Sequence, residues 1–482
     1  MKQLPINSLR PSERLDGTLC TLDGRPLVAA LRPLTQVQID AMREAGIEAV
    51  LKLALNETYD PTNHKRDAVA VQTLPVGHPV AENLYDDEDR LLIGAGQKVT
   101  PETLDILEQR HLRSVFAHHD QGARQYFSFI ETSTQSLIGD LDRLVDSDPD
   151  SLRVTPVGVP AVRSIRIWHG NRRPRKITEQ ILRDYSALAA SMTQCIWQLR
   201  KGQMLTRTTL DEVLDETIEI LGEDKDLAMN LPNVALEEVD HVVKHSIDVA
   251  LLAAATGIYL NYNATQVREL AEAALLHDIG MLEVPEITLS KSSPLTKGEK
   301  SRIYRHTNYG LRVLHRVQTD SLAVALVIHQ SHERESGHGY PANRKGEQIH
   351  DYARIVAIAD MYQALIQPRP HRQRLHPVSA MQSIVKMMKV GLLKKESLLA
   401  FGRAMGAYPI GSFLATSDGQ TARVVASNDQ DLYSPRISLL LDAEGKTASS
   451  SQFVQVRPEK AAKFKPCTDD MLLDGLSPFE GF

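Results

Sequence analysis

The segment Ala274-Leu275-Leu276-His277-Asp278-Ile279-Gly280 places an imidazole beside a carboxylate at the end of a run of leucine and alanine. Burying such a pair is costly unless each group is hydrogen-bonded, paired with a charge or bound to a metal. A single His-Asp dipeptide is more often a helix end with a satisfied histidine than a functional site. The interpretation therefore depends on four further residues that lie in or beside apolar segments: His245, His306, His332 and Asp360.

These apolar segments have the composition of buried helices, and the segment around Asp360 is the clearest case. A carboxylate in the middle of Arg354–Tyr362 requires a partner. Helical bundles hold metals through inward-pointing histidine and carboxylate side chains from several helices. Imidazole and carboxylate without thiolate suit iron, manganese, nickel, cobalt or zinc. The alternative is a set of unrelated core and surface histidines, which six residues in this arrangement disfavour.

Composition limits the class of protein. A chain of 482 residues has room for about three domains, and 42% hydrophobic with 24% charged residues is typical of a globular protein. A net charge of -6 argues against bulk nucleic-acid binding.

Cysteine usage and hydropathy bear on location. The three cysteines lie far apart in the sequence, which predicts no disulfide framework and suits a reducing cytoplasm. The first residues contain no apolar core of a signal peptide. The longest uncharged apolar stretch, Val249–Tyr262, is too short to span a bilayer. We therefore expect a cytoplasmic protein without a membrane partner.

The N-terminal region contains an internal repeat. The pattern from Leu27 to Leu51 recurs from Leu92 to Phe116, shifted by 65 residues. Each copy predicts a strand, a helix capped by a threonine (Thr35 or Thr100) and a second strand, and the two copies could pack their apolar faces together. A sensory or docking module for a protein partner and a structural scaffold are equally open.

The remaining segments complete the expected domain organisation. We predict a tandem α+β repeat module over residues 1–120, a linker and long helices over 121–235, a helical metal-binding bundle over 236–402, and a small β-rich extension over 403–482. Strands are expected at 421–425 and 437–441. The fold class is therefore mostly α, and the long helices suggest a homodimer.

Five motifs in order resemble the HD-GYP family, a branch of the HD superfamily of metal-dependent phosphohydrolases. His277-Asp278-Ile279-Gly280 resembles the HD motif, and Gly339-Tyr340-Pro341 after His332 resembles the name-giving signature. The other matching segments are His245–Ala250, His306 with Gly310, and Arg354–Asp360 followed by Arg369-Pro370. A different HD-type phosphohydrolase would explain the Gly-Tyr-Pro signature less well.

The resemblance implies a phosphodiesterase that hydrolyses cyclic di-GMP to the linear dinucleotide pGpG, to GMP, or to both. It implies two divalent transition metal ions, with Asp278 as the bridging, catalytic ligand. The first ion would take His245, His277, Asp278 and Asp360, and the second Asp278, His306 and His332. Tyr340, Arg369 and Arg372 would bind the substrate.

Several positions depart from the family pattern. Ser331 replaces a usual histidine ligand, and Met281 replaces a lysine expected near the phosphate. Ser336 and Gln363 each stand where the family commonly has an aspartate. We therefore expect a weaker second metal site and reduced activity, unless His329 helps to complete the site. The alternative is a degenerate domain that binds cyclic di-GMP or a protein partner without turnover. His241 stands where some members place a ligand for a third ion, and a helix-surface role is the simpler interpretation.

Overall fold

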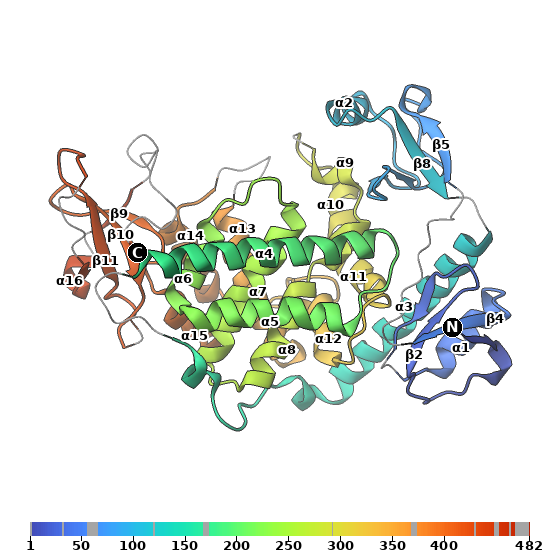
Figure 1. Ribbon diagram of the computed structural model, residues 1–482, viewed down its shortest axis with the longest axis horizontal. Coiled ribbons are helices and arrows are strands. Elements are labelled where there is room, and N and C mark those ends of the chain that lie inside the picture. The colour runs from blue at the N-terminus through green and yellow to red at the C-terminus, as the bar shows by residue number, and fades with distance from the viewer. Residues whose placement is uncertain are drawn as a thin grey trace. The chain divides into compact units, whose positions relative to one another are not determined.

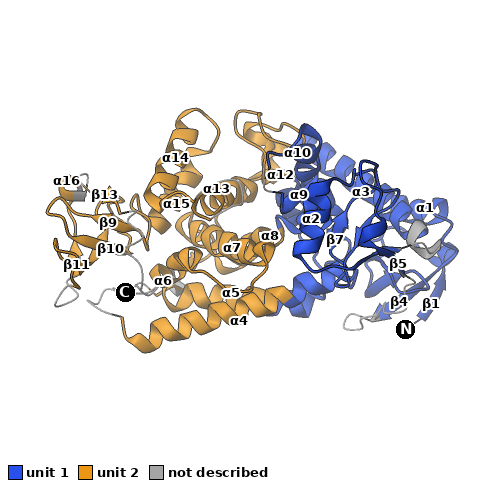
Figure 2. Ribbon diagram, turned by 90° about the horizontal axis from the view of Figure 1, so that it is seen from above, with its two compact units in different colours: residues 1–148, 194–212, 277–329 blue, residues 149–193, 213–276, 330–482 orange. Residues whose placement is uncertain are grey.

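The computed structural model describes residues 2–30, 33–54, 66–118, 121–166, 173–291, 293–367, 374–428, 430–447, 453–461, 464–467 and 482. It divides into two compact units, which Figure 2 shows in different colours. Unit 1 comprises residues 1–148, 194–212 and 277–329, and unit 2 comprises residues 149–193, 213–276 and 330–482. Helices predominate in the described chain, with small antiparallel sheets toward both ends (Figure 1). The predicted mostly α class is confirmed.

Both copies of the N-terminal repeat lie in unit 1 and form strand, helix and strand. Thr35 and Thr100 cap their helices, and each cap is a reciprocal capping box with the residue three positions later. Each copy belongs to a four-stranded sheet, one in the order β1-β4-β2-β3 and the other in the order β5-β8-β6-β7. The elements are β1 (Lys2–Pro5), β2 (Gly17–Cys20), β3 (Pro26–Val28), α1 (Gln36–Glu44), β4 (Ala49–Ala54), β5 (Arg66–Ala70), β6 (Leu84–Tyr85), β7 (Leu91–Ile93), α2 (Pro101–Gln109) and β8 (Ser114–His118).

The two copies do not share one core, contrary to the expectation that they pack on each other. The core of the first copy includes Tyr126, Phe129 and Ile130 of helix α3 (Gln121–Ser147). The core of the second copy includes Ile287 of α9 (Glu286–Leu289). Each copy therefore buries its apolar face against a different helix of unit 1.

The helical part of unit 1 contains a close approach that only glycine permits. The segments are η6 (Ile279–Glu283), α10 (Lys297–Tyr304), α11 (His306–Leu314) and α12 (Leu322–Gln330), whose last residue belongs to unit 2. A Cβ atom added to Gly280 would lie 1.8 Å from the His306 carbonyl oxygen and 2.3 Å from the Gly310 nitrogen. The backbone of η6 therefore packs directly on the start of α11.

Helix α7 (His241–Tyr259) forms the centre of unit 2, where it packs against α8 (Ala264–Leu276), α13 (Asp351–Ile366) and α15 (Lys395–Met405). Asp240 caps its first turn, and nearly every residue from Val243 to Ile258 is buried. The helix has 19 residues and is longer than the uncharged apolar stretch Val249–Tyr262, which by itself is too short to span a bilayer. The whole helix is long and apolar enough to pass a test for a membrane span. Because 89% of that window is buried inside the protein, α7 has the environment of a core helix.

The rest of unit 2 comprises further helices and a C-terminal sheet. The sheet is antiparallel, in the order β12-β11-β10-β9-β13, and the predicted strands near 421 and 437 are confirmed as β10 and β11. The predicted domain boundaries stay predictions. The elements are α4 (Arg175–Arg200) and α5 (Arg207–Glu223), which also contribute to unit 1, then α6 (Lys225–Asn230), α14 (Pro377–Lys389), β9 (Phe413–Ala415), β10 (Thr421–Ala426), β11 (Arg436–Leu441), β12 (Phe453–Gln455), α16 (Pro458–Ala461) and β13 (Lys465–Pro466).

Candidate metal centre

Unit 1 brings three of the predicted ligands together around one carboxylate. His277 and Asp278 follow α8 directly in the chain, and His306 is the first residue of α11. The Asp278 Oδ1 atom lies 3.1 Å from His306 Nε2 and 3.5 Å from His277 Nε2. Both histidines are buried and Asp278 is half-buried. The close packing of Gly280 on α11 fixes the separation between Asp278 and His306.

Unit 2 brings the other three predicted ligands together around a second carboxylate. His245 lies on α7, Asp360 lies on α13, and His332 follows α12 in the chain. The distance from His245 Nε2 to Asp360 Oδ1 is 3.3 Å, and that from His332 Nδ1 to Asp360 Oδ2 is 3.7 Å. The carboxylate that the sequence places in an apolar helix therefore has imidazole partners.

A buried network orients the His245 ring. Its Nδ1 atom lies 3.2 Å from Gln363 Oε1, while Gln363 Nε2 donates to Asp248 at 2.5 Å. Asp248 also accepts from the Tyr185 hydroxyl at 2.5 Å and from Lys244 Nζ at 2.6 Å. Burial and the neighbouring Asp248 carboxylate raise the pKa of Tyr185 well above its ordinary value. Because the amide nitrogen of Gln363 faces a carboxylate, its oxygen must face His245, whose Nδ1 therefore carries the proton.

His306 is oriented in the same way by its own helix region. Its Nδ1 atom lies 2.6 Å from the carbonyl oxygen of Ile303, so this nitrogen is the donor. In His245 and His306 alike, Nε2 is then left facing a carboxylate oxygen. When the ring is neutral, the unprotonated Nε2 atom and the carboxylate oxygen are both acceptors and repel each other. A cation between the two atoms removes this repulsion. The donor set of imidazole and carboxylate fits a divalent transition metal.

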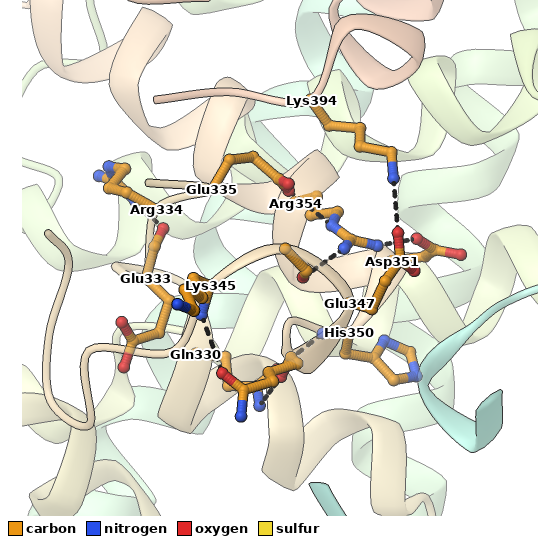
Figure 3. Close-up of polar contacts among 12 residues, drawn as sticks. Gln330, Glu333, Arg334, Glu335, Lys345, Glu347, His350, Asp351, Arg354 and Lys394 are labelled. Carbon is orange, nitrogen blue, oxygen red and sulfur yellow. Dashed lines mark hydrogen bonds and ion pairs between the residues drawn. The ribbon is translucent and has the colours of Figure 1, made fainter. Parts of the chain in front are cut away.

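The segment that carries His332 and Tyr340 is held to α13 by polar contacts of buried side chains (Figure 3). Arg354 donates to Glu335 at 2.7 Å and to the Gly346 carbonyl at 2.5 Å, and it also pairs with Asp351. Gln330 bridges the two ends of the segment, because it donates to the Gln348 carbonyl and accepts from the His350 backbone nitrogen. These contacts give the segment a fixed course.

Within this segment the Tyr340 ring stacks on the His332 imidazole, with ring centroids 4.8 Å apart and an interplanar angle of 11°. Gly339 makes the close return possible, because an added Cβ would lie 2.5 Å from the His332 carbonyl oxygen. Glu333 accepts from the backbone nitrogen of Ala342 at 2.7 Å, and its burial raises the pKa of its carboxyl group. The predicted substrate residue Tyr340 is therefore in direct contact with a predicted ligand.

The other predicted positions have separate outcomes. Arg369 and Arg372 lie outside the described residues. Ser331 and His329 are buried at the end of α12, and Met281 is half-buried in η6. His241 is exposed, yet its ring stacks on that of His245 with centroids 6.0 Å apart.

The sequence interpretation missed the network behind His245. The sequence pattern marks Gln363 only as a replacement for aspartate and assigns no role to Asp248, Lys244 or Tyr185. One signal was available, since Lys244 and Asp248 are four residues apart in an apolar helix and so share a face.

The comparisons with known proteins agree with this geometry. Residues 230–392 match the family model described as HD domain. A cyclic di-GMP phosphodiesterase of Pseudomonas aeruginosa is 27% identical over 321 residues, which cover 66% of this chain and 75% of that protein. The cyclic di-GMP phosphodiesterase response regulator RpfG of Xanthomonas campestris pv. campestris is 30% identical over 204 residues, or 42% of this chain and 51% of that protein. The 3'3'-cGAMP-specific phosphodiesterase 1 of Vibrio cholerae is 36% identical over 146 residues, covering 30% of this chain and 34% of that protein.

An HD domain implies a site for divalent metal, and the described residues supply groups of histidine and aspartate suited to it. The order of the motifs, the matching domain model and the curated relatives all indicate the same family. The domain match over residues 230–392 and the curated relatives support the predicted resemblance of this chain to the HD-GYP family of HD domain proteins.

Proposed function

We propose that this chain is a metal-dependent phosphodiesterase that hydrolyses cyclic di-GMP to pGpG, GMP or both. The observation that carries the proposal is the orientation of His245 and His306, each of which turns Nε2 toward a carboxylate and keeps its Nδ1 proton on an oxygen acceptor. The names of the relatives from Pseudomonas and Xanthomonas support the choice of substrate.

We propose two metal ions, chosen from iron, manganese, nickel, cobalt and zinc. His245, His277, Asp278 and Asp360 would hold the first, while Asp278, His306 and His332 would hold the second. Bound metal ions would supply Lewis-acid chemistry, lowering the pKa of water and neutralising charge on the phosphate. The chain supplies the orientation, because Gln363 and the Ile303 carbonyl keep two of the imidazoles in the tautomer that binds metal.

The substrate contacts are assigned to Tyr340, Arg369 and Arg372. Tyr340 lies against His332 and so can place a guanine or ribose beside the ligands. Guanidinium groups suit phosphate because their forked donors bind two oxygens at once.

Reduced activity is part of the proposal. Ser331 supplies a hydroxyl where an imidazole would be the stronger ligand, and Met281 supplies no charge for the phosphate. A domain that binds cyclic di-GMP or a protein partner without turnover is the alternative, and these two replacements favour it. Binding is expected to survive these replacements better than hydrolysis does.

Calorimetry on the manganese-loaded full chain, together with chromatography of the products, tests the proposal. We expect measurable cyclic di-GMP affinity and slow appearance of pGpG or GMP, with a larger loss of affinity for Arg369→Ala than for Ser331→Ala. Titration with 3'3'-cGAMP in parallel measures the preference between the two cyclic dinucleotides. Binding without any product would establish the non-hydrolytic alternative. Absence of binding would refute any action on cyclic di-GMP and leave a protein partner as the alternative.

We also propose that the repeat module at residues 1–120 binds a protein partner, that the chain forms a homodimer through its long helices, and that it is located in the cytoplasm.

A further inference from the structure

A second candidate binding site lies wholly within unit 1. It is a cavity of about 670 Å³, within the range of about 300–1,000 Å³ usual for small-molecule sites. Its walls come from the β2–β3 turn of the first repeat copy, the β6–β7 region of the second copy, the start of α3, the end of α4, and the η6 and α10–α11 segments. We call it the repeat-side cavity.

The repeat-side cavity is strongly basic. The lining contains seven arginine or lysine residues and two carboxylates, Asp89 and Glu283. The basic residues are Arg25, Arg200, Lys201, Arg302, Arg305, Arg312 and Arg316. Glu283 pairs with Arg312 at 2.9 Å, and Asp89 pairs with Lys201 at 3.3 Å. Outside the lining, Asp23 pairs with Arg25 and Glu131 pairs with Arg312 at 3.3 Å. The positive charge that these carboxylates leave includes that of Arg302 and Arg305.

Three of the arginines have donors to spare for a ligand. Within the part of the chain that the structure describes, Arg302 and Arg305 make no side-chain hydrogen bond or ion pair. Arg316 is largely buried, and its Nε atom has no hydrogen-bond partner among those same residues. Guanidinium groups in such a position favour a phosphate or another multivalent anion.

The cavity also presents aromatic rings that are unusually exposed. Trp197 is 41% exposed and Phe127 is 45% exposed, and both line the cavity. The Lys201 ammonium lies 5.9 Å from the centre of the Trp197 ring, so a cation and a stacking surface adjoin each other. Exposed aromatic faces beside cations are the combination that binds a planar base joined to phosphate.

We propose that the repeat-side cavity binds a nucleotide that carries more than one phosphate, with its base on Trp197 and its phosphates on Arg302, Arg305 and Arg316. The site is separate from the proposed hydrolytic function and does not depend on it. It lies beside the metal residues in the sequence, because Glu283 and Arg305 are near neighbours of Asp278 and His306. A ligand here would therefore contact the segments that position two predicted ligands.

Tryptophan fluorescence of the full, metal-loaded chain tests the proposal with ATP as the probe. The Trp168→Phe variant leaves Trp197 as the only tryptophan, since the sequence has two. We expect saturable quenching by ATP and at least about tenfold weaker binding of tripolyphosphate, which has the charge without the ring.

Calorimetry with ATP on four variants assigns the site. Trp197→Ala and the double variant Arg302→Ala/Arg305→Ala should each weaken binding by about tenfold or more. The matched control Arg143→Ala removes an exposed arginine of the same unit that does not line the cavity, and it should leave the affinity for ATP unchanged. Asp278→Asn should also retain ATP binding. Absence of quenching, unchanged affinity in both cavity variants, or loss of binding in Asp278→Asn would overturn the proposal.

Discussion

Replacing Gln363 with leucine should weaken metal binding although Gln363 is not a predicted ligand. The substitution removes the oxygen that accepts from His245 Nδ1 at 3.2 Å and the nitrogen that donates to Asp248 at 2.5 Å. The His245 ring can then rotate or move its proton to Nε2, the atom that faces Asp360. Loss of such an outer partner costs about 10–100-fold in metal affinity, or about 1.4–2.7 kcal/mol.

The same substitution should also lower stability. Asp248 is fully buried and keeps its contacts with Tyr185 and Lys244, so the carboxylate is not left alone. Loss of one hydrogen bond to a buried charged group costs about 1.5–3 kcal/mol. We expect the free energy of unfolding of the metal-depleted protein to fall by roughly this amount in chemical denaturation.

Gln367→Leu is the matched control, because Gln367 also donates to Asp248, at 3.4 Å, whereas Gln363 is the amide that lies at hydrogen-bond distance from His245 Nδ1. Manganese affinity, measured by competition with a coloured chelator, should fall in Gln363→Leu and stay within about twofold of the parent in Gln367→Leu. Equal manganese affinity in the parent and in both variants would refute the argument that the amide holds the His245 tautomer.

Three other perturbations have outcomes that follow from the structure. Gly280→Ala should destabilise the protein by roughly 3 kcal/mol or more in chemical denaturation, since the added Cβ would lie 1.8 Å from the His306 carbonyl oxygen. The control Gly298→Ala has open space around the added Cβ and should be neutral or slightly stabilising. Ser331→His should raise both metal occupancy and hydrolysis, measured by elemental analysis and product formation, and no change in either would mean that another residue already completes the second site. Burial lowers the pKa of His350 from 6.5 to about 4. As the pH drops from 6.5 to 4, the imidazole is therefore protonated in the unfolded chain before it is in the folded chain, and the free energy of unfolding should fall by about 3 kcal/mol. His350→Asn, which retains a capping side chain, should lose that part of the pH dependence in denaturation at each pH, and an unchanged profile would contradict the assignment.

The sequence predicted those features that depend on local pattern. The caps at Thr35 and Thr100 follow from a threonine before an apolar periodic segment, and both are present. The carboxylate Asp360 was recognisable because a charge in an apolar helix needs a partner, and His245 and His332 lie near it.

Features that depend on contacts distant in the chain were not predictable in this way. The hydrogen bond between His245 and Gln363 joins residues 118 positions apart, and nothing in the local sequence around either residue indicates it. The packing of the two repeat copies on different helices was likewise missed, because apolar periodicity shows that a face is buried but not against what.

Hydrolysis of cyclic di-GMP before and after metal removal tests the central claim most directly. The purified full chain would be depleted with a chelator, then reloaded with manganese, and the products separated by chromatography at each stage. We expect pGpG or GMP to be absent after depletion, to return on reloading, and to fall by at least about 100-fold in Asp278→Asn. Product formation that persists without metal, or that is equal in Asp278→Asn and the parent, would contradict the proposed metal centre.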